Sequence, residues 1–186
     1  MSHAKAGARE RLESVRSDLI ALSHRIHAHP ELGFEEEKAS AWLCERLSDA
    51  GFAVEKGICD LPTAFRARAG AGPLHVAFCA EYDSLPAIGH ACGHNIIAAA
   101  AVGAAIAAAQ VADEIGLTVS VIGTPAEEVG NASGKILLLE RGAFAGIDAA
   151  MMVHPAPIDM CRAKIIAASM FDVHCSGKAS HASAFP

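Results

Sequence analysis

The chain reads Leu74-His-Val-Ala-Phe-Cys-Ala80 and then Glu81-Tyr-Asp83, and it continues to an alanine-rich run from Ile96 to Ala109. The first stretch is short and mostly apolar, which is typical of a strand buried on both faces. The alanine-rich run falls short of the ~20 residues that span a bilayer, so it predicts a buried helix. A strand that ends in polar residues and is followed by a buried helix indicates an α/β protein.

The flanking sequence repeats this alternation of helices and strands. Apolar residues at spacings of three and four predict amphipathic helices from about Ala8 to His29 and from Glu35 to Gly51. Short apolar stretches predict strands at residues 52–54, 63–68, 117–123, 149–153 and 164–175, and a helical segment is expected at residues 134–141. We therefore expect an α/β/α sandwich with a mostly parallel central sheet.

Length and composition restrict the classes of function. The chain has 186 residues, enough for one domain or for one domain and the beginning of another. Hydrophobic residues make up 52%, which indicates a packed globular core, and a net charge of -6 without clustered Lys and Arg argues against a nucleic-acid partner. No secretory signal or membrane segment is expected. Six cysteines without close paired spacing favour a reduced, cytoplasmic setting.

Polar residues of the kinds that bind metals follow three of the predicted strands. Glu81-Tyr-Asp83 comes after the strand at residues 74–80, Glu127-Glu128 follows the strand at residues 117–123, and His154 follows the strand at residues 149–153. In open α/β sheets, ligands bind beyond the carboxyl ends of the strands. This convergence predicts a functional site at one edge of the sheet.

The residue types at this edge suit a divalent metal ion. Cys92 and His94 lie two apart in a glycine-containing loop, a spacing that can aim a thiolate and an imidazole at one centre. In the Glu127-Glu128 pair, one carboxylate could bind metal while the other remains free to accept a proton. His154 is the natural additional ligand. The pattern therefore predicts a metal site with a general base beside it.

Three other readings remain open at this point. Cys92 could be a nucleophile activated by a neighbouring histidine or the reactive thiol of a redox protein, although the Glu127-Glu128 pair would then have no role. The metal could also stabilise a domain that does no chemistry, because metal ligation alone does not make a catalyst.

Five stretches resemble the metallo-amidohydrolase and aminoacylase family of metallopeptidases, in the order in which that family carries them. The central stretch looks most like the branch of aminobenzoyl-glutamate hydrolases and amidohydrolase-type dipeptidases. The matching stretches are His27-Ala-His-Pro-Glu-Leu-Gly-Phe, Ala80-Glu-Tyr-Asp-Ser-Leu-Pro-Ala-Ile-Gly-His-Ala-Cys-Gly-His-Asn, Gly123-Thr-Pro-Ala-Glu-Glu, Met152-Val-His-Pro and Gly177-Lys-Ala-Ser-His-Ala-Ser.

The resemblance assigns a role to each site residue. It implies two divalent ions, zinc or manganese, and no other cofactor. Glu127 would be the general base that activates the attacking water, and Asp83 would support the site from behind by orienting a ligand imidazole. His181 would contact the substrate carbonyl, often across a dimer. The metal ligands would be Cys92, His94, Glu128 and His154, with Cys92 in the bridging position.

The resemblance also implies an incomplete chain. Residues 1–163 would form the N-terminal part of a zinc-peptidase-like catalytic domain, and residues 164–186 would begin an α+β lid domain through which the longer form dimerises. The rest of the lid and a final ligand histidine would be missing. The implied activity is cleavage of an amide bond in N-acyl amino acids, aminobenzoyl-glutamate-like compounds or dipeptides. We expect weak or no activity from this chain alone, and the alternative is an inactive fragment that binds only metal or a partner.

Overall fold

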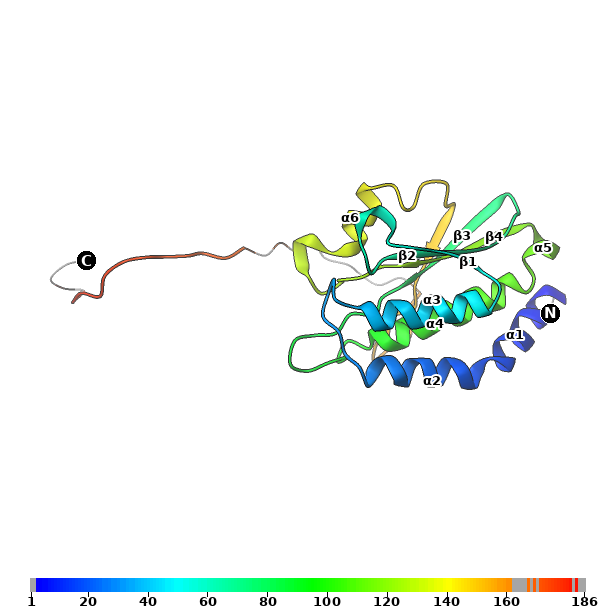
Figure 1. Cartoon of the computed structure of the whole chain (residues 1–186), viewed down its shortest axis with the longest axis horizontal. Helices are drawn as coiled ribbons and strands as arrows, with labels where there is room; N and C mark the ends of the chain where they lie inside the picture. Colours follow the sequence, from blue (N-terminus) through cyan, green and yellow to red (C-terminus); the bar gives the residue numbers. More distant parts are fainter. Residues whose placement is uncertain (1–2, 162–166, 168, 170, 182, 184–186) are drawn as a thin grey trace.

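A five-stranded mixed sheet forms the centre of the domain, and helices lie on both of its faces (Figure 1). The computed structural model describes residues 3–161, 167, 169, 171–181 and 183. The strands are β1 (Ala53–Lys56), β2 (Phe65–Gly70), β3 (Leu74–Ala80), β4 (Leu117–Gly123) and β5 (Ala149–Met151). Their order in the sheet is β1-β2-β4-β3-β5.

Strand direction confirms the predicted α/β fold with a mostly parallel sheet. β3 pairs in parallel with both β4 and β5, whereas β2 is antiparallel to both β1 and β4. Only β2 therefore runs against the other four strands. The sequence did not predict this reversal, because the apolar pattern of a strand carries no information about its direction.

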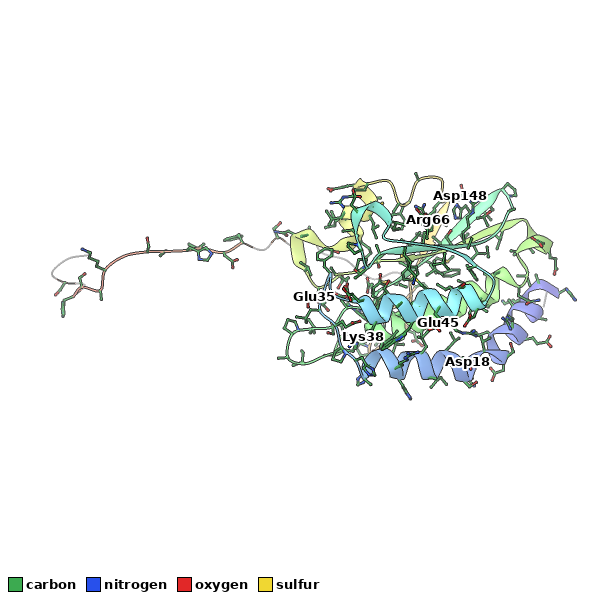
Figure 2. All side chains as sticks on the ribbon, in the orientation of Figure 1. Asp18, Glu35, Lys38, Glu45, Arg66 and Asp148 are labelled. Atoms are coloured by element: carbon green, nitrogen blue, oxygen red, sulfur yellow. The ribbon has the colours of Figure 1, made fainter. Side chains whose placement is uncertain are left out.

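The helices are α1 (His3–Ser14), α2 (Arg16–His27), α3 (Glu37–Asp49), α4 (His94–Ala109), α5 (Ala112–Ile115) and α6 (Gly134–Glu140), and 3-10 turns occur at Ile58–Asp60 and Gly130–Ala132. The prediction of one continuous helix from Ala8 to His29 is wrong. The buried residue Val15, at φ -111° and ψ 5°, separates α1 from α2. Charged side chains such as Asp18, Lys38 and Glu45 lie on the exposed sides of α2 and α3 (Figure 2).

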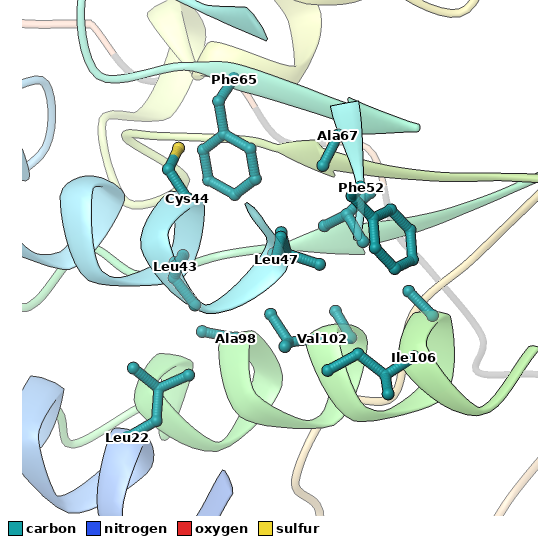
Figure 3. Close-up of a cluster of buried hydrophobic side chains, with 14 of the residues drawn as sticks. Leu22, Leu43, Cys44, Leu47, Phe52, Phe65, Ala67, Ala98, Val102 and Ile106 are labelled. Carbon is teal, nitrogen blue, oxygen red and sulfur yellow. The ribbon is translucent and has the colours of Figure 1, made fainter. Parts of the chain in front are cut away.

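The main hydrophobic core lies between the sheet and the α3–α4 layer (Figure 3). Leu43 and Leu47 of α3 and Val102 of α4 are fully buried there, opposite Phe65 of β2. Alanine on most faces of α4 allows α2 to approach closely. At Gly103 an added Cβ would lie 2.7 Å from Cδ1 of Leu19, so only glycine fits this contact without displacing its neighbour. The sequence prediction of a buried helix here is confirmed.

A smaller core covers the opposite face of the sheet beneath α6. Its buried members include Ile58, Leu61, Ala77, Ile122 and Leu138. The β5 edge is different, since all three residues of this strand are exposed. The central strand β4 is therefore well buried, while the two edge strands, β1 and β5, are mostly exposed.

Ile26 offers a direct test of core packing beside the functional loops. Its side chain is 0% exposed near the end of α2. Ile26→Val is expected to lower the free energy of unfolding by about 0.5–1.5 kcal/mol, because the variant loses one buried methyl group. Urea unfolding followed by circular dichroism measures this change. The same replacement at the half-exposed Ile20 is the control and should have a smaller effect.

The C-terminal part carries no regular structure where it is described. The residues after Met151 that the structure describes form no helix or strand, and residues 171–181 extend away from the domain (Figure 1). A strand was predicted at residues 164–175. Residues 167, 169 and 171–175 of this range are described and are not in a strand, and the other residues of the range lie outside the described part of the chain. The predicted domain boundary at 163/164 also lies outside it. In the described part of the chain, every helix is too short or too polar to cross a membrane.

Candidate metal centre

The carboxyl ends of β3, β4 and β5 meet at one edge of the sheet because these three strands are adjacent and parallel. β3 leads into Glu81 and Asp83, and β4 leads into the loop that carries Glu127 and Glu128. The chain also places the N-terminus of α4 at this edge, since α4 begins at His94. The convergence of polar residues predicted from the strand ends is therefore present.

His94 is the central side chain of the site. It is 1% exposed, and its Nδ1 lies 2.7 Å from Oδ1 of Asp83, which fixes the ring and directs Nε2 toward the acidic residues. Nε2 lies 3.5 Å from Oε2 of Glu81 and 3.8 Å from carboxylate oxygens of both Glu127 and Glu128. Asp83 is thus placed where the resemblance implied that it would orient a ligand imidazole.

Asp83 also holds the loop after β4. Its Oδ2 accepts a hydrogen bond of 2.9 Å from the backbone N–H of Glu128, while Oδ1 contacts His94. A single buried carboxylate therefore fixes the position of two neighbouring side chains that come from different parts of the chain.

Two sets of side chains in the described part of the chain could each hold a cation. One consists of Cys92, His94 and Glu128, and the other of Glu81, His94 and His154. Within each set, the possible ligand atoms all lie within 4.8 Å of one another. The structure thus brings together all four predicted ligands around His94 and adds Glu81.

Two buried atoms in this cluster have no hydrogen-bond partner. They are Nε2 of His94 and Oε2 of Glu81. A buried polar atom without a partner costs free energy, and a cation between these atoms would satisfy both. Thiolate, imidazole and carboxylate together form a donor set that suits zinc and related divalent ions. The residues therefore fit the metal that the sequence predicts.

His94 belongs to both sets, and this limits what they can hold at once. Its Nδ1 is engaged by Asp83, so Nε2 alone is available as a ligand atom. One nitrogen lone pair binds one cation. The described residues therefore provide one three-ligand centre at a time, and a second cation would have to use ligands other than His94.

Sequence reasoning noted Glu81 among the polar residues at the strand ends but gave it no role in the site, and it missed its partner Lys135. Glu81 is 1% exposed, and Lys135 from α6 forms an ion pair with its Oε1. A signal for Glu81 was present: in an extended segment, residues two apart face the same side, so Glu81 accompanies Asp83 while Tyr82 points into the core. Lys135 had no such signal, because its contact with Glu81 joins residues 54 positions apart.

The two remaining predicted histidines are less enclosed. His154 is exposed, its Nδ1 lies 2.8 Å from the carbonyl oxygen of Pro155, and its ring centroid lies 6.2 Å from that of His94. His181 is exposed and lies outside any helix or strand, and its Nδ1 accepts a hydrogen bond from the backbone N–H of Ser183. The structure therefore includes His154 in one of the ligand sets, and neither set includes His181.

Burial and neighbouring charges alter the proton affinities of the site. Burial raises the pKa of Glu127, and the charge of Glu81 raises it further, while Lys135 opposes the change. Burial lowers the pKa of His94, but the hydrogen bond and charge of Asp83, aided by Glu81 and Glu127, outweigh it and raise the pKa overall. A raised carboxylate pKa brings Glu127 closer to the neutral range in which a general base works best.

The surroundings of Cys92 differ from those of a redox thiol. Its hydrogen bond with Glu128, together with burial and nearby carboxylate charges, raises the pKa of the thiol to about 11. The redox reading required a lowered pKa, so this environment counts against it. A divalent cation would reverse the effect, because a coordinated thiol is deprotonated.

Alkylation measures this property of Cys92. After treatment with a chelator, the rate of its reaction with iodoacetamide should be low at neutral pH and should rise as the pH approaches about 11, since only the thiolate reacts. Saturating Zn²⁺ or Mn²⁺ should protect Cys92, while the exposed Cys161 and Cys175 serve as controls in the same mass spectrum. Rapid alkylation at neutral pH despite saturating metal would favour the redox reading.

Comparison with known proteins supports the predicted family. The sequence pattern of "Peptidase family M20/M25/M40" matches residues 77–169. The chain is 44% identical to mouse Xaa-Arg dipeptidase over 98% of its own length and 45% of that protein. It is 33% identical to one of the subunits of p-aminobenzoyl-glutamate hydrolase from Escherichia coli, over 94% of the chain and 40% of that protein.

A solved structure of the same family has a similar fold. A dinuclear metal-binding peptidase of the M20 family from Bacillus subtilis superposes with a TM-score of 0.65 at 28% identity, over 74% of this chain and 42% of that chain. The chain spans less than half the length of each of these relatives. The resemblance found in the sequence is confirmed, and the chain belongs to peptidase family M20/M25/M40.

Proposed function

We propose that this chain contributes the metal-binding half of a hydrolase that cleaves an amide bond, with Glu127 as general base. The observation that carries the proposal is the buried cluster around His94, in which two unpartnered polar atoms face each other among three further acidic side chains. Membership of the M20/M25/M40 family supports it.

The metal would be held by Cys92, His94, Glu128 and His154, with Glu81 as an additional ligand. We propose two divalent ions, zinc or manganese, in the complete site. When bound, such ions lower the pKa of water and polarise a carbonyl oxygen. Because His94 can serve only one cation, a second would need other ligands, and the sequence resemblance implies that Cys92 would contribute to holding both.

Glu127 is proposed to move the proton in this reaction. It accepts a proton from the attacking water as the water oxygen forms a bond to the amide carbon, and it then delivers that proton to the amine nitrogen as the carbon–nitrogen bond breaks. Its raised pKa suits both steps. Asp83 keeps Nδ1 of His94 engaged and the Glu128 backbone in place throughout.

His181 is proposed to stabilise the oxyanion that develops on the substrate carbonyl. The sequence resemblance implies that it would do so across a dimer, in the site of a second copy of the protein. A homodimer formed through a lid domain that begins near residue 164 would allow this exchange.

The proposed substrates are small N-acyl amino acids, aminobenzoyl-glutamate-like amides or dipeptides. Relatives named for these compound classes include Xaa-Arg dipeptidase, p-aminobenzoyl-glutamate hydrolase and the N-acetyl-L-cysteine deacetylase of Bacillus subtilis. The higher identity to Xaa-Arg dipeptidase favours dipeptides. Six free cysteines support a reducing, cytoplasmic setting.

Metal analysis combined with a substrate panel tests the proposal. The 186-residue chain and a longer form that includes the rest of the family's length would be loaded with Zn²⁺ or Mn²⁺ and assayed on Xaa-Arg dipeptides, p-aminobenzoyl-glutamate and N-acetyl amino acids. We expect both forms to bind metal and the longer form to release amine. A longer form that binds no divalent ion, or binds it and cleaves none of these amides, would contradict the proposal.

A second candidate, a chain that binds metal without catalysis, is favoured by one observation. His94 is shared between the two ligand sets, so the described residues provide one three-ligand centre at a time. Metal binding by the 186-residue chain with no response to any amide would support this reading for the chain on its own.

A further inference from the structure

The stretch that begins at His27 is part of the family pattern, but none of its residues contacts the metal cluster in the proposed function. It leads into Glu36, which is 0% exposed although the neighbouring Glu35 and Glu37 are exposed. We propose that Glu36 is a positioning residue that sets the backbone of the loop carrying Glu127 and Glu128. This inference rests on the proposed function, since it assigns Glu36 to the same site.

Both carboxylate oxygens of Glu36 are engaged. Oε1 accepts a hydrogen bond of 2.7 Å from the backbone N–H of Ala126, and Oε2 accepts one of 2.9 Å from Oγ1 of Thr63. The Ala126 contact spans 90 positions in the sequence and reaches the residue directly before Glu127. Glu36 belongs to neither ligand set, and its contact with the loop passes through the backbone.

Ala126 needs such an anchor because of its conformation. Its φ is +55°, in the left-handed region that a residue with a Cβ rarely adopts. Strained conformations of this kind persist where surrounding contacts hold them. The turn at Ala126 decides where the next two side chains point, so the contact with Glu36 fixes the direction of both Glu127 and Glu128.

Gly33, from the same N-terminal stretch, packs against this loop. An added Cβ at Gly33 would lie 2.5 Å from Cγ2 of Val129 and 3.0 Å from Cα of Ala126. The segment thus supports the loop by close packing at Gly33 and by a hydrogen bond at Glu36.

The same segment braces the loop after β3. The carbonyl oxygen of Glu31 accepts hydrogen bonds of 2.9 Å from both N–H and Oγ of Ser84, next to Asp83. The Glu31 carboxylate accepts from the backbone N–H groups of Lys38 and Ala39 at the start of α3. One N-terminal segment therefore ties together the two loops that supply Asp83 and the Glu127-Glu128 pair.

A series at position 36 tests the proposal through metal affinity measured by competition with a chelator, using Zn²⁺ on the 186-residue chain. Glu36→Leu removes the acceptor and is expected to weaken Zn²⁺ binding by about 10–100-fold, the range for residues that orient metal ligands. Glu36→Gln keeps an oxygen for the Ala126 N–H and should stay within about 3-fold of the parent, well below that range.

Two control variants separate positioning from stability. Glu35→Leu replaces the exposed neighbour (Figure 2), and Thr63→Val removes the other hydrogen bond of Glu36 while leaving the Ala126 contact. Both should bind Zn²⁺ like the parent at a temperature at which every variant is folded. The proposal would be overturned if Glu36→Leu folded and bound Zn²⁺ with the parental affinity. It would also be overturned if Glu36→Gln folded and bound Zn²⁺ as weakly as Glu36→Leu.

Amide hydrogen exchange in the unsubstituted, metal-free chain decides the matter if Glu36→Leu does not fold. The Ala126 N–H should be protected to a degree similar to the Thr124 N–H, which donates to the carbonyl oxygen of Ala80. Rapid exchange at Ala126 alone would overturn the inference. Failure of the parent chain to bind Zn²⁺ would instead contradict the proposed function. The exchange measurement would still test the hydrogen bond between Glu36 and Ala126, because it uses the metal-free chain.

Discussion

Replacing Glu127 with Gln is expected to lower kcat for amide hydrolysis by about 10²–10⁴-fold, the usual contribution of a general base, while bound metal is retained. Glu127 belongs to neither of the two ligand sets around His94, although its Oε2 lies 3.8 Å from Nε2 of that residue. Glutamine keeps the size of the side chain but cannot accept the proton. The loss should therefore appear in turnover and not in metal content.

The measurement combines steady-state kinetics of an active, longer form with metal analysis of the same samples. Glu140→Gln, an exposed glutamate on α6, is the matched control and should leave both quantities unchanged. If the Glu127 variant turned over substrate at close to the parental rate, the general base would have to be another group. If it lost its metal, Glu127 would be a ligand.

His94→Ala should have the largest effect on metal binding. His94 supplies a ligand atom to both sets, so its removal leaves each with two ligands. Loss of residues that merely orient a ligand weakens metal binding by about 10–100-fold, and we expect loss of this ligand to exceed that range. The variant would also leave Asp83 and Glu81 buried without their imidazole partner.

Isothermal titration of the 186-residue chain with Zn²⁺ checks this expectation. His24→Ala, at an exposed position on α2, is the control for loss of an ordinary histidine. Cys92→Ser and His154→Ala each damage only one ligand set and should cost less than His94→Ala. Equal losses of Zn²⁺ affinity in all three variants would show that the two ligand sets are not alternatives. Unchanged Zn²⁺ affinity in the His94 variant would show that the metal does not bind at this cluster.

Local sequence was sufficient for most of the fold. The strand at residues 74–80 was predicted with the bounds that β3 has, and the strand at residues 117–123 with those of β4. Both are mostly apolar and are followed by polar residues, so neighbouring residues alone define them. The buried α4 was also evident, since its alanine content leaves no polar face. Short segments were less well predicted: α5 was missed, and α1 and α2 were merged.

The gathering of the site residues also followed from the sequence, because it depends on a general property of parallel sheets. If Glu81-Tyr-Asp83, Glu127-Glu128 and His154 each follow a strand, and those strands are parallel neighbours, the residues must meet at one edge. That reasoning predicts at which edge of the sheet each loop lies. It does not decide which atoms of these residues face one another.

The roles of individual side chains within the cluster were decided by tertiary structure. The ion pair of Lys135 with Glu81, the anchoring of Ala126 by Glu36 and the sharing of His94 between two ligand sets all join residues distant in sequence. None has a local pattern, because each depends on how packed elements orient their side chains. The chain by itself determined the strands, the buried helix and the list of ligand-type residues. Packing alone determined the antiparallel direction of β2 and the contacts around His94, since contact between distant segments exists only once the core has formed.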